Sequence, residues 1–173
     1  IMRLLIAREA LDPHLKMGGP VLNTTLPWKT RLLAAFRSAG FYSFWYPSLW
    51  MPVFFAPKEV LPEFRADARK VKALSRKLAR KLFHAMLRYG PKLEKKQVLL
   101  GRFVELGAEL FAMSASMGMA RQLIESGRGD RMDLTETVSF FNRISRGKIE
   151  DLFRAIGSNS DSEGYKIAKR MLE

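Results

Sequence analysis

The chain has 173 residues, of which 47% are hydrophobic, and its formal net charge is +13. That length suffices for one domain with its own core, or for a domain and an arm. The absence of cysteine excludes disulfides, thiolate metal ligands and cysteine nucleophiles. Because the chain starts at Ile1 and not at Met, we expect a piece of a longer translation product. The start shows no charged-then-apolar pattern of a signal segment.

The first residues have the pattern of a helix that is ending. Residues 1–11 are mostly apolar, and Asp12-Pro13 follows them. A proline disfavours helical geometry for the residue before it, so we expect the helix to stop there. The glycines and proline of residues 17–20 then predict a linker.

Residues 27–39 predict a short amphipathic helix. Trp28, Leu32 and Phe36 recur at helical spacing, and proline is suited to the first helical position. We expect Gly40 to end this helix.

Residues 41–55 hold eight aromatic side chains together with Pro47 and Pro52. Prolines restrict a strand to a sheet edge, so we interpret the stretch as an irregular, aromatic-rich loop. The prolines also interrupt the longest apolar stretch, residues 41–56, which is shorter than the roughly 20 residues of a membrane-spanning helix.

A regular helical pattern begins at Pro62 and continues to Tyr89, where Gly90-Pro91 interrupts it. Residues 62–96 carry twelve of the thirty Lys and Arg side chains and only three acidic ones. Such a basic helix suits an anionic partner, either a phosphate backbone or an anionic lipid, and is equally consistent with a solvated face.

The remaining chain predicts three further helices. Residues 92–126 are apolar on most of the helical circumference and contain many small residues, which is typical of a helix in the middle of a bundle. A loop at 127–130 follows, and a helix is expected to begin at Asp133 in a capping-box-like arrangement with Glu136. A short helix over 162–173 comes last. The expected core of this all-α bundle includes Leu99, Leu100, Phe103, Leu110 and Met113.

The sequence contains little that indicates catalysis. His14 and His84 are far apart in the chain, and neither has a carboxylate at metal-ligand spacing. Glu105 and Glu109 lie four residues apart, but with Arg102 nearby they favour ion pairs over an acid pair. No phosphate-binding glycine loop is present. We therefore expect no catalytic, cofactor-binding or metal-binding residue here.

Two segments resemble acyl-CoA dehydrogenases of the very-long-chain type. Ile1-Met2-Arg3-Leu4 with Ala7-Arg8-Glu9-Ala10 is similar to the segment that follows the Glu-Gly-Thr motif in that family. Residues 97–113, QVLLGRFVELGAELFAM, resemble the extra C-terminal domain of the same branch. The chain departs from the family pattern in its unusually aromatic stretch, residues 41–55.

The resemblance implies a non-catalytic portion of an FAD-dependent enzyme of fatty acid β-oxidation. The catalytic glutamate and the FAD contacts of the parent would lie before Ile1, so this chain alone is expected to be inactive and to hold no cofactor. The implied partners are the rest of the dehydrogenase chain, a second subunit in a homodimer and an anionic membrane surface, with acyl-CoA bound only by the parent. The implied location is peripheral, at the inner membrane of a bacterium or on the matrix side of the mitochondrial inner membrane.

The resemblance and the composition together predict three parts. Residues 1–16 would end the dehydrogenase core, residues 17–61 would form a membrane or docking segment, and residues 62–173 would form the C-terminal helical domain. Aromatic rings settle at the headgroup level of a bilayer while Lys and Arg attract anionic lipid. The predicted membrane or docking residues are Trp28, Phe36, Phe41, Phe44, Trp45, Trp50, Phe54, Arg65, Arg69, Lys72 and Arg76.

Three alternatives remain open from the sequence. The aromatic side chains are also explained by packing into the dehydrogenase core or into a dimer interface. The basic helix and the sequence pI of about 10.3 suit a module that binds nucleic acid, although no recognised binding motif is present. A bundle that only docks to a partner protein is the third alternative.

Overall fold

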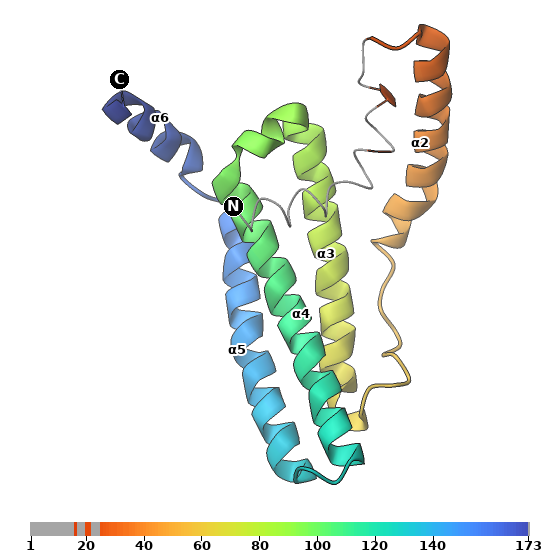
Figure 1. The fold of residues 1–173 in the computed structure, drawn as a ribbon, viewed down its shortest axis with the longest axis vertical. Coiled ribbons are helices and arrows are strands. Elements are labelled where there is room, and N and C mark those ends of the chain that lie inside the picture. The colour runs from red at the N-terminus through yellow and green to blue at the C-terminus, as the bar shows by residue number, and fades with distance from the viewer. Residues whose placement is uncertain (1–15, 17–19, 22–24, 173) are drawn as a thin grey trace.

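The computed structural model describes residues 16, 20–21 and 25–172, and it confirms the all-α fold (Figure 1). The helix end predicted for residues 1–11 lies outside the described residues. The α-helices and the two short 3-10 helices are α2 (Trp28–Ser48), η1 (Pro62–Phe64), α3 (Arg65–Tyr89), η2 (Gly90–Lys95), α4 (Gln97–Glu125), α5 (Arg131–Gly157) and α6 (Asp161–Leu172).

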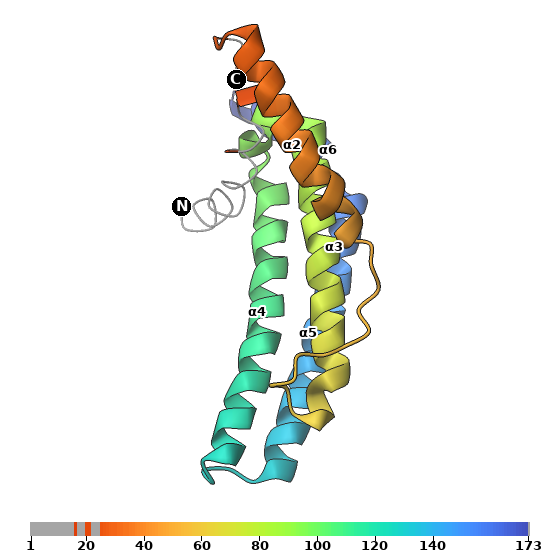
Figure 2. The same ribbon diagram turned by 90° about the vertical axis from the view of Figure 1, so that its right-hand side faces the viewer.

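Helices α3, α4 and α5 form an antiparallel three-helix bundle, with α4 packed against both neighbours (Figures 1 and 2). The five core residues predicted on α4 are all buried, and Leu106 and Met113 are completely inaccessible. From α3 and α5, Val71 and Ile149 complete the same cluster. Each fully buried side chain of this kind stabilises the fold by about 1.5–3 kcal/mol, so α4 anchors the bundle.

The turns of the bundle follow the glycines of the sequence. Gly90 ends α3 with a φ of 49°, and Gly127 follows α4 with a φ of 67°, both values that favour glycine. The expected start of the second bundle helix was five residues early, because η2 occupies residues 90–95 and α4 begins at Gln97.

The expected cap of α5 was also misplaced. The Asp130 side chain accepts hydrogen bonds from the backbone nitrogens of Met132 (2.8 Å) and Asp133 (3.0 Å), so the helix begins at Arg131. Asp133 lies instead in the first turn, where a negative charge is favourable near the positive end of the helix dipole.

A polar contact joins α3 to α5 inside the bundle. Asp67 accepts hydrogen bonds from Asn142 Nδ2 at 3.1 Å and from Arg146 Nη1 at 3.0 Å. Asn142 is completely buried, as is its neighbour Ser145. The contact fixes the register of the two helices, and Lys77 Nζ of α3, 4.2 Å from the centroid of the Phe153 ring of α5, adds a second link.

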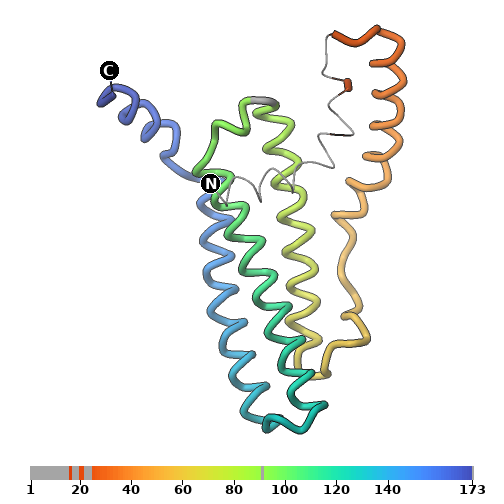
Figure 3. The backbone as a smooth tube through the Cα atoms, in the orientation of Figure 1, coloured from red at the N-terminus to blue at the C-terminus, as the bar shows by residue number. Residues whose placement is uncertain are grey.

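Helix α2 is longer than expected. The predicted loop over residues 41–55 is wrong for residues 41–48, which continue the helix through Gly40 and through Pro47 in its last turn. Residues 49–61 then run back along α3 without regular structure (Figure 3). Arg121 Nη1 donates to the Glu59 carbonyl at 2.6 Å and ties the end of this segment to α4.

Helix α6 points away from the bundle (Figure 1). It has no buried residue, and Met171 and Leu172 are 82% and 89% exposed. The expected helix over 162–173 therefore exists, one residue earlier at its start, but it adds nothing to the apolar core.

Candidate functional site

Helix α2 presents large apolar side chains to solvent along its length. Trp28 is 68% exposed, Phe36 69% and Phe44 84%. Leu32 and Leu33 are also exposed on this helix, although the aromatic pattern of the sequence did not single them out. A contiguous group of such side chains marks an interaction surface, since free in water it invites aggregation.

The second half of α2 docks on α3 through aromatic rings. Tyr42, Trp45 and Tyr46 surround Phe83, with ring centroids 5.1, 5.7 and 5.4 Å from the Phe83 ring. Tyr46 Oη is also hydrogen-bonded to His84 Nε2 at 2.8 Å. Trp45, one of the predicted membrane residues, is thus a half-buried contact between two helices. Burial raises the pKa of Tyr42 above its ordinary value.

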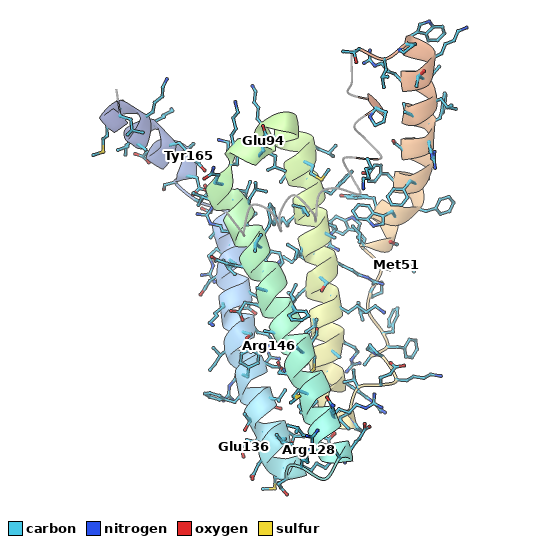
Figure 4. The ribbon with its side chains drawn as sticks, in the orientation of Figure 1. Met51, Glu94, Arg128, Glu136, Arg146 and Tyr165 are labelled. Atoms are coloured by element: carbon cyan, nitrogen blue, oxygen red, sulfur yellow. The ribbon has the colours of Figure 1, made fainter. Side chains whose placement is uncertain are left out.

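Two arginines of α3 hold the chain that follows α2. The Arg80 guanidinium lies 4.4 Å above the Trp50 ring and donates to the Leu49 carbonyl. Arg76 Nη1 donates to the Met51 carbonyl at 2.5 Å, where Figure 4 shows Met51 beside α3. Of the predicted site residues, Arg76 and Trp50 are therefore engaged in this internal contact, although Trp50 keeps 60% of its surface exposed.

A second exposed group combines aromatic and basic side chains. Phe54 and Phe55 are 68% and 83% exposed and share a shallow pocket with Lys58, Arg65 and Arg69. Phe55 and Lys58 were missed from the sequence, although each lies next to or near a predicted residue. Aromatic rings beside cations form the arrangement that an anionic interface requires.

The last two predicted residues lie at the margins of these groups. Phe41 is 42% exposed and stacks on Trp45, with ring centroids 6.2 Å apart. Lys72 is exposed, but it borders a groove together with Val60 and Val71, away from α2. The structure thus brings Phe54, Arg65 and Arg69 together, and Lys72 lines the neighbouring groove.

Helix α4 leaves a second apolar surface uncovered. Phe111 is 73% exposed and Met119 54%, and Ala108 and Ala115 on the same side of the helix are also exposed. We define these four residues as the α4 stripe. The small residues of α4 were expected to allow close packing, but within this chain a Cβ added at Gly107 or Gly118 would meet nothing within 4 Å.

Two further observations limit the chemistry available. Among the described residues, no three His, Asp or Glu side chains are grouped so that they could hold a metal ion. In the same part of the chain, no helix combines the length and apolar content needed to cross a bilayer.

Comparison with known proteins finds similar sequences among probable acyl-CoA dehydrogenases. The chain is 40% identical over 176 aligned residues to the probable acyl-CoA dehydrogenase FadE10 of Mycobacterium bovis, and equally to FadE10 of two strains of Mycobacterium tuberculosis. The match includes all of this chain and lies in the C-terminal part of those proteins. This chain is related to the acyl-CoA dehydrogenases.

The chain spans 27% of the length of the curated relatives it matches. No protein-family model matches it, and no solved structure matches it significantly. Residues 97–113 of this chain, which carry the resemblance to the acyl-CoA dehydrogenases, form the first half of α4. The apolar members of that segment are mainly core residues, and Arg102 forms an ion pair with Asp161 (2.5 Å) at the start of α6. That hydrogen-bonded carboxylate raises the pKa of Arg102.

Proposed function

We propose that this chain is the C-terminal, non-catalytic portion of an FAD-dependent acyl-CoA dehydrogenase, and that it brings the enzyme to an anionic membrane surface. The parent enzyme would dehydrogenate long-chain acyl-CoA in fatty acid β-oxidation. The proposal is supported by the sequence relationship and by the uncovered aromatic side chains of α2. Because the relatives are bacterial, we propose a peripheral location at the cytoplasmic side of the inner membrane.

The observation that carries the membrane role is the exposure of Trp28, Phe36 and Phe44 on one helix. Moving one such side chain from water into an interface is worth up to about 1.5–3 kcal/mol. An exposed Lys or Arg near anionic lipid adds about 1 kcal/mol. Three such rings on α2 would therefore suffice for reversible binding without a spanning helix, and Arg65 and Arg69 would add to the separate group around Phe54 and Phe55.

The two contributions should respond differently to salt. Exposed charges are screened over about 8 Å at physiological ionic strength, so the Arg65 and Arg69 contribution should fall as salt rises. The aromatic contribution should persist. Sedimentation with phosphatidylcholine vesicles, with and without phosphatidylserine, measured across a salt series separates them.

The decisive variant replaces Phe36 and Phe44 with Ser. Both side chains are exposed and neither contacts Phe83, so the variant should fold while losing sedimentation even at low salt. Phe111→Ser is the control, since Phe111 is exposed to a similar degree, 73%, but lies on the bundle. Equal sedimentation of the double variant and the native chain would overturn the membrane proposal. Binding to duplex DNA in moderate salt, with no binding to vesicles, would favour the nucleic-acid alternative instead.

We also propose a docking role for the α4 stripe. Phe111 and Met119 are large apolar groups on the helix that otherwise forms the core, and the relatives have about three quarters of their length outside the matched region. We propose that the rest of the dehydrogenase chain covers the stripe, with a homodimer as the assembled form. Phe111→Asp should then reduce co-purification of this chain with the remainder of the enzyme expressed separately, whereas Phe44→Ser should not.

A further inference from the structure

A cavity of about 710 Å³ lies at one end of the bundle, where α3 and α5 end and α4 and α6 begin. It adjoins the α2 contact at His84, which is hydrogen-bonded to Tyr46, but no residue of α2 or of the α4 stripe lines it. Figure 4 labels Tyr165, which marks the α6 side of this end of the bundle. Because four chain segments meet here, the cavity exists only in the folded bundle.

The wall on the α3 side is basic. Lys81, His84 and Arg88 line it, and their spacings of three and four residues place them on one face of the helix. Lys96 approaches from the far side of the turn that joins α3 to α4. Three permanent cations and one histidine therefore surround a single space.

These cations have no carboxylate to neutralise them. In the part of the chain that the structure describes, none of Lys81, Arg88 and Lys96 takes part in a salt bridge. The acidic residue that lines the cavity, Asp161, is already bound by both Nη atoms of Arg102, at 2.5 and 2.8 Å. The cavity is thus strongly positive at neutral pH.

Aromatic rings hold the basic groups at the opening. Lys96 Nζ lies 5.7 Å from the Tyr89 ring centroid and 5.2 Å from that of Tyr165. The Arg88 guanidinium lies 5.6 Å from the Tyr89 ring. Such contacts position a cation without neutralising its charge. The hydroxyls of Ser158 and Ser162 add neutral hydrogen-bonding groups to the wall.

We propose that this cavity binds a phosphate-bearing ligand. Phosphate oxygens accept hydrogen bonds from Lys and Arg, and charge-assisted bonds of this kind are about twice as strong as neutral ones. The phosphate belongs on the side of Lys81, Arg88 and Lys96, because the C-terminal end of α5 carries partial negative charge. The volume accommodates a group of nucleotide or lipid-headgroup size.

The test uses the 173-residue chain with defined probes at constant ionic strength. The soluble probes are inorganic phosphate and inorganic pyrophosphate, measured by calorimetry. The membrane probes are phosphatidylcholine vesicles with and without phosphatidic acid, measured by sedimentation. The two arms distinguish a free phosphate from a lipid headgroup as the source of the same chemistry.

Neighbouring lysines provide a matched pair of variants. Lys96 lines the cavity, whereas Lys95 is exposed and does not. We expect Lys96→Gln combined with Arg88→Gln to weaken binding of at least one probe roughly tenfold, which corresponds to about 1.4 kcal/mol. We expect Lys95→Gln combined with Lys92→Gln to change it less than about twofold, because this control removes the same two charges from exposed side chains outside the cavity.

A second pair protects the test against misfolding. If the Lys96 variant unfolds, Lys81→Gln within the cavity is compared with Lys70→Gln on an exposed part of α3. A selective loss in the cavity variants supports the site, and the responding probe identifies the source of the phosphate. Equal losses in the cavity and control variants, or the absence of binding by every probe, would overturn the proposal.

Discussion

Arg102 and Asp161 form a two-point ion pair that joins the first half of α4 to the first residue of α6. The Tyr165 hydroxyl accepts a hydrogen bond from the backbone nitrogen of Val98 at 3.3 Å and adds a second link. Because α6 has no buried residue, these polar contacts hold the helix in place.

We expect Asp161→Asn to release α6 while leaving the bundle folded. Loss of a partly exposed ion pair costs about 1 kcal/mol, which is large for a helix without apolar anchoring. Hydrogen exchange of residues 161–172 should become faster, with unchanged exchange in α4 and α5. Asp151→Asn is the control, because its pair with Arg154 is about three-quarters exposed. Unchanged exchange in α6 of the Asp161 variant would show that other contacts hold the helix.

Replacement of Asp67 with Ala should destabilise the bundle itself. Asn142 and Arg146 lose their shared acceptor, and Asn142 is completely buried. Unsatisfied buried groups of this kind cost about 2 kcal/mol in the free energy of unfolding, measured by urea denaturation. Asp67→Asn retains an acceptor oxygen and should lose less. An alanine variant as stable as the native chain would contradict this account of the α3–α5 contact.

The buried and exposed faces of α4 predict losses of stability of different size when a large side chain is replaced with Ala. Met113 is completely buried, so Met113→Ala should lower the free energy of unfolding by about 2–5 kcal/mol. Phe111 is 73% exposed two residues away, so Phe111→Ala should change stability by less than about 0.5 kcal/mol. Thermal or urea unfolding of both variants measures the difference. Similar losses would mean that the stripe is covered within this chain.

Docking of α2 should weaken in alkaline solution. Burial raises the pKa of Tyr42 above 10.0, the ordinary value, so the folded state favours the neutral phenol. The contribution of the neutral Tyr42 phenol to the stability of the folded state is fully present below pH 10. It is lost as the pH rises from there through the pKa that Tyr42 has in the folded state. Tryptophan fluorescence should report a change in the Trp45 environment in that range. The change should shrink in Tyr42→Phe but persist in Tyr165→Phe, and equal behaviour of the two variants would show that Tyr42 is not the group responsible.

Periodicity predicted the bundle because its helices bury one regular face. The apolar positions on α3 and α4 recur every three or four residues, and glycines mark both turns. The same rules failed for α2, where Gly40 and Pro47 indicated an interruption. Glycine costs a helix about 1 kcal/mol, and the packing of Tyr42, Trp45 and Tyr46 on Phe83 offsets that cost.

The surfaces were less predictable than the core. Composition identified the aromatic segment, but it could not separate Phe44, which faces solvent, from Trp45, which packs on α3. The basic cavity was beyond sequence reasoning, because Lys81 and Tyr165 are distant in the chain and meet only where four helix ends converge. Local patterns specify which face of a helix is apolar, whereas the position of its neighbour depends on the whole fold.

Helix α2 is attached to α3 near its own C-terminal end, around Phe83, so a small rotation there displaces its N-terminal end by a larger distance. Trp28 lies 17 residues before Trp45, which corresponds to about 26 Å along a helix. A tilt of about 20° around the Phe83 contact carries Trp28 through roughly 9 Å, while the bundle itself stays still. The direction in which the exposed rings point therefore depends on the packing around Phe83, together with the Tyr46–His84 hydrogen bond beside it. A substitution at Phe83 changes where the arm reaches without changing any residue on its exposed surface.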